Sequence, residues 1–332
     1  MTTAAPLLDV SHQSVYLTSP AGEVCPVDDV SFTLDRGETL GVVGESGSGK
    51  SMLVRSLMNI LPAGGRLGER SAVHFEGRDL RHRSRREARH FWGTHVAMVF
   101  QDPMTSLNPV RTIGAQLADP LRYHLGLGRR EVHRRSVALL ERVEIPDPVR
   151  RLRQYPHELS GGMRQRVTIA IALSCDPRLL IADEPTTALD VTVQRQILDL
   201  LDGLRRERGM AMILISHDLL LVGDHADRVA VMYAGRFVET SPAAELQRAP
   251  AHPYTSALLA SIPRVDKPSQ GPLRTIEGRP PRLDALPSGC AFGPRCPRAD
   301  SACEAAPPLA VTGEQRAAAC HHPLSTVTAG GA

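Results

Sequence analysis

The chain has 332 residues, of which 42% are hydrophobic and 23% charged, the composition of an ordinary globular protein with room for one large domain and a smaller one. Its net charge of +3 is too small to require a nucleic-acid partner. The longest apolar runs, such as Met210–Ile215, have the length of a strand and not of a membrane span. Because the first residues also lack the basic region of a secretory signal, we expect a cytosolic protein that reaches a membrane only through partners.

A glycine-rich octet is the first strong signal along the chain. It follows the apolar run Thr39–Val43, which predicts a short buried strand, and it precedes Met52–Met58, which predicts the start of a helix. A loop in that setting closes backbone N–H groups around phosphate oxygens at the positive end of the helix. Lys50, one of only two lysines in the chain, would reach the terminal phosphates, and the Ser51 hydroxyl would complete a Mg²⁺ site. The predicted phosphate-binding residues are Gly44, Glu45, Ser46, Gly47, Ser48, Gly49, Lys50 and Ser51.

An arginine-rich segment runs from Arg78 to Arg89. One interpretation is contact with nucleic acid. We favour a solvated helix face, because no aromatic residues alternate with the arginines to stack on bases.

Polar residues follow two further predicted strands. Gln101 comes directly after the strand-like Val96–Phe100, and the apolar run Leu179–Ala182 ends in Asp183 and Glu184. Asp183 would hold Mg²⁺, and Glu184 is placed to polarise an attacking water as a general base.

A second anion site is predicted at Leu159–Met163, which opens a helical pattern. Ser160 is a natural N-cap, and Gly161 and Gly162 expose backbone N–H groups to an anion. Farther along, His217 follows the predicted strand Ile213–Ser216. On its own this histidine has the pattern of a solvated loop residue.

Together these segments resemble the nucleotide-binding subunit of ABC transporters over roughly residues 8 to 250. The octet matches the Walker A motif of that family. The other matches, in chain order, are Gln101 with the Q-loop, Leu159–Met163 with the signature, Leu179–Glu184 with Walker B, Ala188–Asp190 with the D-loop, and His217 with the switch histidine.

The resemblance implies a role for each matched residue. Gln101 would sense the γ-phosphate and Mg²⁺, and His217 and Glu184 would serve hydrolysis. Asp190 would lie at the nucleotide. Tyr16 falls where the family places an aromatic that stacks on adenine; the alternative is a strand residue packed in the core.

The fold implied is α/β, with a RecA-like P-loop core, a β-rich N-terminal subdomain and a helical subdomain of about residues 105–165 that carries the signature. We expect this ATPase domain to span residues 1–255. Of the 26 prolines, 14 lie between Pro242 and Pro323, and four of the six cysteines lie in the same stretch, which predicts that residues 256–332 form a loop-rich extension.

Four segments, two of which extend beyond the Q-loop and signature matches, are similar to the oligopeptide, dipeptide and nickel importers of this family, in their D-type ATP-binding subunit. They are Gln101–Pro109, His157–Arg166, His252–Leu259 and Gly289–Cys296. The resemblance implies import of di- or oligopeptides, with nickel or another small solute as the alternative. A hypothesis from a different class is an ABC ATPase that acts on nucleic acid. Such proteins usually contain a long coiled coil or a duplicated ATPase, and this sequence shows neither.

The partners implied are two membrane permease subunits, a second ABC ATPase and an extracytoplasmic substrate-binding protein, with no nucleic acid. Two ATPase subunits, identical or paralogous, would pair head to tail, with each ATP between Walker A of one and Ser160, Gly161 and Gly162 of the other. The chain would then lie peripherally on the cytoplasmic face of the membrane.

Four cysteines near the C-terminus, Cys290, Cys296, Cys303 and Cys320, predict a metal site, because clustered thiols in a reducing cytosol favour metals over disulfides. Four thiolates suit zinc or an iron–sulfur cluster. Some members of the importer family carry a 4Fe-4S cluster at matching cysteines, which favours that cluster over zinc or free thiols. His321 and His322 are alternative ligands, whereas Cys25 and Cys175 stand alone.

Overall fold

The computed structural model describes residues 5–19, 22–80, 87–88, 91–102, 106–187, 189–262 and 275–324. The chain separates into two compact units whose segments alternate along the sequence. The first unit consists of Met1–Thr33, Leu40–Asp79 and Ser216–Ala332, and the second of Leu34–Thr39 and Leu80–Ile215. The division of the sequence at residue 255 stays a prediction.

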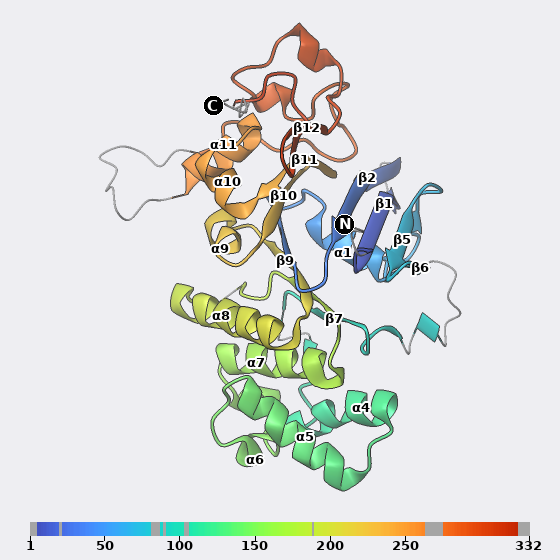
Figure 1. Cartoon of the computed structure of the whole chain (residues 1–332), viewed down its shortest axis with the longest axis vertical. Helices are drawn as coiled ribbons and strands as arrows, with labels where there is room; N and C mark the ends of the chain where they lie inside the picture. Colours follow the sequence, from blue (N-terminus) through green and yellow to red (C-terminus); the bar gives the residue numbers. More distant parts are fainter. Residues whose placement is uncertain are drawn as a thin grey trace. The chain divides into compact units, whose positions relative to one another are not determined.

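The N-terminal part of the first unit is an antiparallel β structure (Figure 1). Its strands are β1 (Leu8–Ser19), β2 (Gly22–Leu34), β4 (Arg66–Leu67), β5 (Ala72–Phe75) and β6 (Arg78–Asp79). They are ordered β2-β1-β5-β6, with β4 paired to β1. Helix α1 (Lys50–Leu57) is tied to β1 by a buried hydrogen bond in which Gln13 Nε2 donates to Ser56 Oγ over 2.7 Å. Most of the arginine run from Arg78 to Arg89 lies outside the described residues, and Arg78 itself belongs to β6.

A second group of strands in the first unit is ordered β12-β13-β11-β10-β3. Their bounds are β3 (Thr39–Val43), β10 (Arg228–Tyr233), β11 (Arg236–Pro242), β12 (Ala310–Gly313) and β13 (Arg316–Ala318). Strand β3 is buried along its whole length and runs parallel to β10, as its continuous apolar sequence predicts. The C-terminal extension joins this group directly, because β13 pairs with β11.

Helices of the first unit that follow the strands are short. They are α9 (Leu219–Gly223), α10 (Ala243–Arg248) and α11 (Pro253–Ser261), with 3₁₀ turns at Gly293–Arg295 and Ser301–Glu304. His252 caps α11, its Nδ1 accepting the N–H of Tyr254 over 3.0 Å.

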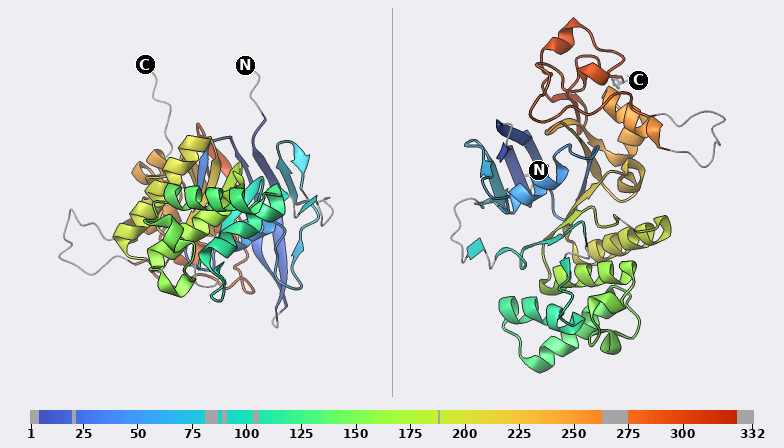
Figure 2. Two further views of the ribbon diagram at one scale, coloured as in Figure 1. Left: turned by 90° about the horizontal axis from the view of Figure 1, so that it is seen from below. Right: turned by 180° about the vertical axis from the view of Figure 1, so that it is seen from behind.

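The second unit combines a parallel set of strands with most of the long helices. Strands β7 (Val96–Val99), β8 (Leu179–Asp183) and β9 (Ala211–Ser216) lie side by side in parallel, with β8 in the middle. The helices are α4 (Ile113–Leu125), α5 (Arg129–Arg142), α6 (Pro148–Arg151), α7 (Gly161–Ala172) and α8 (Val191–Arg208), with 3₁₀ turns at Pro156–Glu158 and Leu173–Cys175. Helices α4, α5 and α7 pack on one another, and they stay grouped in all views (Figures 1 and 2).

Side-chain caps set the ends of these helices. Thr112, Ser160 and Asp190 each accept a backbone N–H of the first turn of α4, α7 and α8 respectively. Helices α4 and α8 end at glycines in the left-handed conformation, Gly126 and Gly209. Among the described residues, no helix is both long enough and apolar enough to cross a lipid bilayer.

Candidate functional site

The glycine-rich octet forms the connection between β3 and α1, where the sequence predicted a strand, a loop and a helix. Lys50 is the first residue of α1, and its side chain is buried against the loop. The Lys50 ammonium donates to the carbonyl oxygens of Gly44 and Glu45 over 2.8 and 3.1 Å. The loop therefore curls around a buried cation at the N-terminal end of a helix, which is the electrostatic setting that binds phosphate.

Two glycines are required by the way this loop packs. Gly49 has φ of +106°, and a Cβ there would lie 2.1 Å from the carbonyl oxygen of Pro26. At Gly44 a Cβ would lie 2.2 Å from the carbonyl oxygen of Met232. Because backbone atoms occupy the space that a side chain would need, no larger residue fits at either position without moving the loop.

In the second unit, the structure brings together Gln101 and Glu184. The Gln101 Nε2 donates to Glu184 Oε2 over 2.9 Å, and the Thr187 hydroxyl donates to the same oxygen over 2.9 Å. Glu184 has φ of +47°, and its N–H donates to Ile215 O on β9 over 3.0 Å. The preceding Asp183 is 1% exposed at the end of β8. Pro103–Thr105, which continue the segment after Gln101, lie outside the described residues.

The start of α7 and the segment before α8 also lie together in the second unit. Ser160 caps α7, its Oγ accepting the N–H of Met163 over 3.3 Å, and both Ser160 and Gly161 are exposed. A Cβ on Gly162 would lie 3.0 Å from Val193 Cγ1 on α8. Asp190, exposed, caps α8 through Val193 N over 2.9 Å, whereas Ala188 lies outside the described residues. Two helix N-termini are thus close neighbours, and the glycines that open α7 are at least partly exposed.

His217 and Tyr16 belong to the first unit. His217 is exposed between β9 and α9, one residue before Asp218, which caps α9. Tyr16 lies on β1 with the Arg66 guanidinium 4.2 Å from its ring centre. Arg66 in turn holds Glu23 through both carboxylate oxygens. One face of the Tyr16 ring is therefore covered by a cation, and adenine stacking stays a prediction for this residue.

The four C-terminal cysteines line one pocket of the first unit, together with His252, Phe292 and the two neighbouring histidines, His321 and His322. All four are free thiols. Burial raises the pKa of the Cys290 and Cys320 thiols, and the nearby cysteines raise it further because adjacent thiolates repel one another. A bound cation would offset this repulsion at Cys290 and Cys320, because it stabilises the thiolate form.

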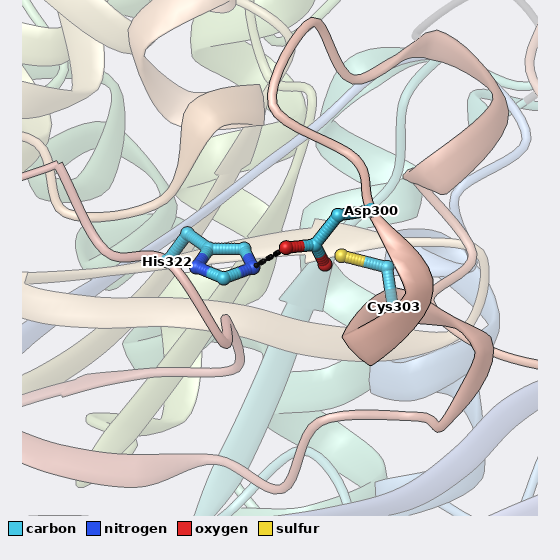
Figure 3. Close-up of side chains that lie close together, drawn as sticks. All are labelled: Asp300, Cys303 and His322. Carbon is cyan, nitrogen blue, oxygen red and sulfur yellow. Dashed lines mark ion pairs between the residues drawn. The ribbon is translucent and has the colours of Figure 1, made fainter.

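Among the described residues, one group of potential metal ligands combines two of these predicted residues with an acid. Asp300, Cys303 and His322 each offer one atom within 4.8 Å of the others. The His322 Nε2 lies 2.9 Å from Asp300 Oδ2, and Cys303 Sγ lies beside that carboxylate (Figure 3). The pairing with His322 lowers the pKa of Asp300. The sequence pattern gave no signal for Asp300, since the acid lies between two of the cysteines without a recognisable spacing.

Comparison with known proteins decides the family. Residues 27–187 match the ABC transporter family, and residues 238–303 match the oligopeptide/dipeptide transporter C-terminal region. The oligopeptide transport ATP-binding protein OppD of Salmonella typhimurium is 49% identical over 319 residues, which cover 96% of this chain and 94% of that protein. This chain belongs to the ATP-binding subunits of ABC transporters. A putative peptide import ATP-binding protein of Brucella ovis is also 49% identical, over 95% of this chain and 96% of its own length.

Solved structures agree on the fold of the ABC subunit. The ATP-binding cassette MJ0796, in a dimeric post-hydrolysis state with ADP and phosphate, has a TM-score of 0.63 at 24% identity, covering 71% of this chain and 98% of that one. The cassette cbiO1 of Clostridium perfringens has a TM-score of 0.61 at 27% identity, covering 73% and 90%. The expected α/β, RecA-like ABC ATPase core is thereby confirmed, and the chain is an ATPase of the ABC type.

The packing of the Walker A loop gives a testable contrast between two glycines. We expect Gly49→Ala to lower the free energy of unfolding by roughly 2–5 kcal/mol, from the left-handed backbone and the clash with Pro26, and to abolish ATP binding. Gly47→Ala is the matched control. Gly47 has φ of +81° and nothing within 4 Å of its Cβ position, so only the backbone penalty of about 1–2 kcal/mol applies. Urea unfolding measures the stability of the two variants, and titration with a fluorescent ATP analogue measures their affinity for ATP. Equal losses of stability at Gly49 and Gly47 would contradict the packing argument.

Proposed function

We propose that this ABC subunit is the ATP-hydrolysing component of a binding-protein-dependent importer of di- or oligopeptides. The observation that carries the proposal is the similarity of about half of all residues, over nearly the full length, to oligopeptide transport ATP-binding proteins of Salmonella typhimurium and Escherichia coli. The match to the oligopeptide/dipeptide transporter C-terminal region supports it independently of the ATPase motifs. Nickel or another small solute remains the alternative cargo for the same architecture.

In this proposal the Walker A residues bind the triphosphate of ATP. Lys50 and the backbone N–H groups of Gly44–Ser51 would meet its charge, and Ser51, Gln101 and Asp183 would hold Mg²⁺. The metal would neutralise charge that develops on the transferred phosphoryl group. What supports the lysine assignment is its burial and its position at the start of α1.

Glu184 is our candidate for the general base that polarises the attacking water, with His217 as the second catalytic residue. Two hydrogen bonds, from Gln101 and Thr187, fix the Glu184 carboxylate on one oxygen. A base held in this way is aimed before the water arrives, which is how positioned carboxylates accelerate proton transfer.

The exposed signature supports a second ATPase subunit as partner. Ser160 and Gly161 are exposed at the N-terminus of α7, where the ATP of another cassette would bind, and Asp190 is exposed as well. We therefore propose a head-to-tail pair of cassettes on two membrane permease subunits at the cytoplasmic face, with a substrate-binding protein that delivers the peptide.

We expect Glu184→Gln to bind ATP normally and to slow hydrolysis by roughly 10²- to 10⁴-fold, because the amide cannot accept a proton. Glu207→Gln is the matched control, since Glu207 lies half-exposed on α8 in an ion pair with Arg142. Phosphate release by the purified subunit, alone and with its partners, measures the effect. Turnover of Glu184→Gln near the wild-type rate would reject the assignment of Glu184.

The importer itself is tested by purifying the tagged chain from its host in mild detergent and identifying the associated proteins by mass spectrometry. We expect two polytopic membrane proteins, an ATPase partner and a binding protein. Uptake of labelled tripeptides by cells should be lost with Glu184→Gln and kept with Glu207→Gln. Loss of nickel uptake alone would favour the alternative cargo, and recovery of soluble nucleic-acid-binding partners alone would reject transport.

We also propose that Cys290, Cys296, Cys303 and Cys320 hold a 4Fe-4S cluster, with zinc as the alternative. The donor chemistry supports a thiolate-bound centre, because all four cysteines line one pocket and sulfur is the ligand that zinc and iron–sulfur clusters prefer. Such a centre would join loops of a proline-rich extension that has little apolar sequence for a core of its own, so its role would be structural.

We expect anaerobically purified protein to contain about four irons and four sulfides per chain and to absorb visible light. Cys296→Ser should lose the iron and lower the thermal midpoint of the extension, whereas Cys25→Ser should leave both unchanged. Metal analysis that finds one zinc and no sulfide would support the alternative. Protein without bound metal after anaerobic purification would reject the centre.

A further inference from the structure

We propose that Arg295 in the C-terminal extension is a positioning residue for the Walker A loop, which it controls by holding and neutralising the carboxylate of Glu45. The inference deepens the proposed function, since it rests on ATP binding to that loop. It also gives the extension a part in the ATPase reaction through a single contact within the first unit.

The Arg295 guanidinium and the Glu45 carboxylate form two parallel hydrogen bonds. Arg295 Nη1 donates to Glu45 Oε2 over 2.7 Å, and Arg295 Nη2 donates to Glu45 Oε1 over 3.1 Å. The arginine side chain is 4% exposed and the glutamate 25%, so the pair is shielded from water. Paired parallel hydrogen bonds between a guanidinium and a carboxylate fix both distance and orientation, which a single ion contact does not.

Other contacts fix the guanidinium in place. Its Nη1 also donates to Tyr233 Oη over 3.2 Å, and its Nε donates to the carbonyl of Glu277 over 3.0 Å. The neighbouring Phe292 is buried edge-on against Tyr233 with ring centres 5.4 Å apart. Arg295 therefore cannot swing away from Glu45 without disturbing the end of β10 and an aromatic cluster.

Glu45 connects the Walker A loop to the residues packed around it. Its carbonyl accepts one of the Lys50 hydrogen bonds, and its N–H donates to Tyr254 Oη over 2.9 Å. A shift of Glu45 would therefore move the lysine that meets the phosphates. Without Arg295, its carboxylate would also stand unpaired beside an incoming triphosphate and repel it, in surroundings where screening by water is weak.

The test measures ATP affinity of the purified full chain by titration with trinitrophenyl-ATP and competition by ATP. We expect Arg295→Met to raise the Kd for ATP by about 5- to 50-fold. Arg282→Met is the control. Arg282 lies in the same extension, but it pairs with Asp284 instead of a residue of the Walker A loop, and its side chain is 78% exposed. Arg282→Met should bind ATP like the wild type.

The double variant Glu45→Gln/Arg295→Met separates this role from support of the fold. With the carboxylate removed as well, we expect more than half of the lost affinity, on a logarithmic scale, to return. A purely structural role for Arg295 predicts a double variant as weak as Arg295→Met. That result, or wild-type affinity in a folded Arg295→Met, would overturn the inference.

If Arg295→Met does not fold, as judged by circular dichroism, Arg295→Lys replaces it. The lysine keeps the positive charge but cannot grip both oxygens, so we expect a smaller but measurable loss of affinity. Wild-type affinity in Arg295→Lys would then count against the positioning role. A wild-type chain that binds no ATP would reject the proposed function itself, whereas normal wild-type binding with unaffected variants rejects only the inference about Arg295.

Discussion

The conformation of the Walker A loop depends on backbone atoms of other segments of the first unit that pack directly against it. The carbonyls of Pro26 and Met232 occupy the space beside Gly49 and Gly44, and Gly235 N donates to Ser48 O over 2.9 Å. Such contacts leave the loop one conformation, with its N–H groups converging at the start of α1. An anion site made of backbone dipoles needs this rigidity, since a loop that relaxed would spread the dipoles and weaken the field.

The C-terminal extension belongs to the same packing and is not an appendage beside it. Strand β13 pairs with β11, and the buried Arg316 donates from Nη2 to Ala249 O over 2.5 Å. Phe292 joins Tyr233 and Tyr254 in a buried aromatic cluster. Because a segment this rich in proline and poor in apolar residues cannot form its own core, it gains stability by packing on the ATPase strands. The resulting closeness to the loop is what brings Arg295 to Glu45.

Local features of the site were predictable from the sequence. The strand, loop and helix around Gly44–Ser51 follow from an apolar run, closely spaced glycines and a helical pattern, all within about 20 residues. The cap at Ser160 likewise follows from a hydroxyl residue before a helical pattern. Each of these signals depends on neighbours in the chain, so no knowledge of tertiary packing is needed.

Contacts between distant segments could not be predicted in this way. Glu45 and Arg295 are 250 residues apart, and neither has a local pattern that names its partner. The same holds for Asp300 with His322, and for the Arg66 guanidinium over Tyr16. Charge pairs of this kind are fixed only when the strands and loops have packed, because many arginines and acids in the sequence are equivalent before folding.

Glu184 illustrates how the fold maintains a costly conformation at a position proposed for catalysis. A non-glycine residue with φ of +47° is destabilised by about 1–3 kcal/mol, yet three hydrogen bonds offset that cost. Its N–H is held by Ile215 on the adjacent strand, and its carboxylate by Gln101 and Thr187. In a relaxed extended backbone the side chain would leave the strand end in another direction and lose both carboxylate contacts. The strain therefore sets the direction of the carboxylate, and the hydrogen bond from Gln101 makes that direction depend on a segment expected to respond to nucleotide.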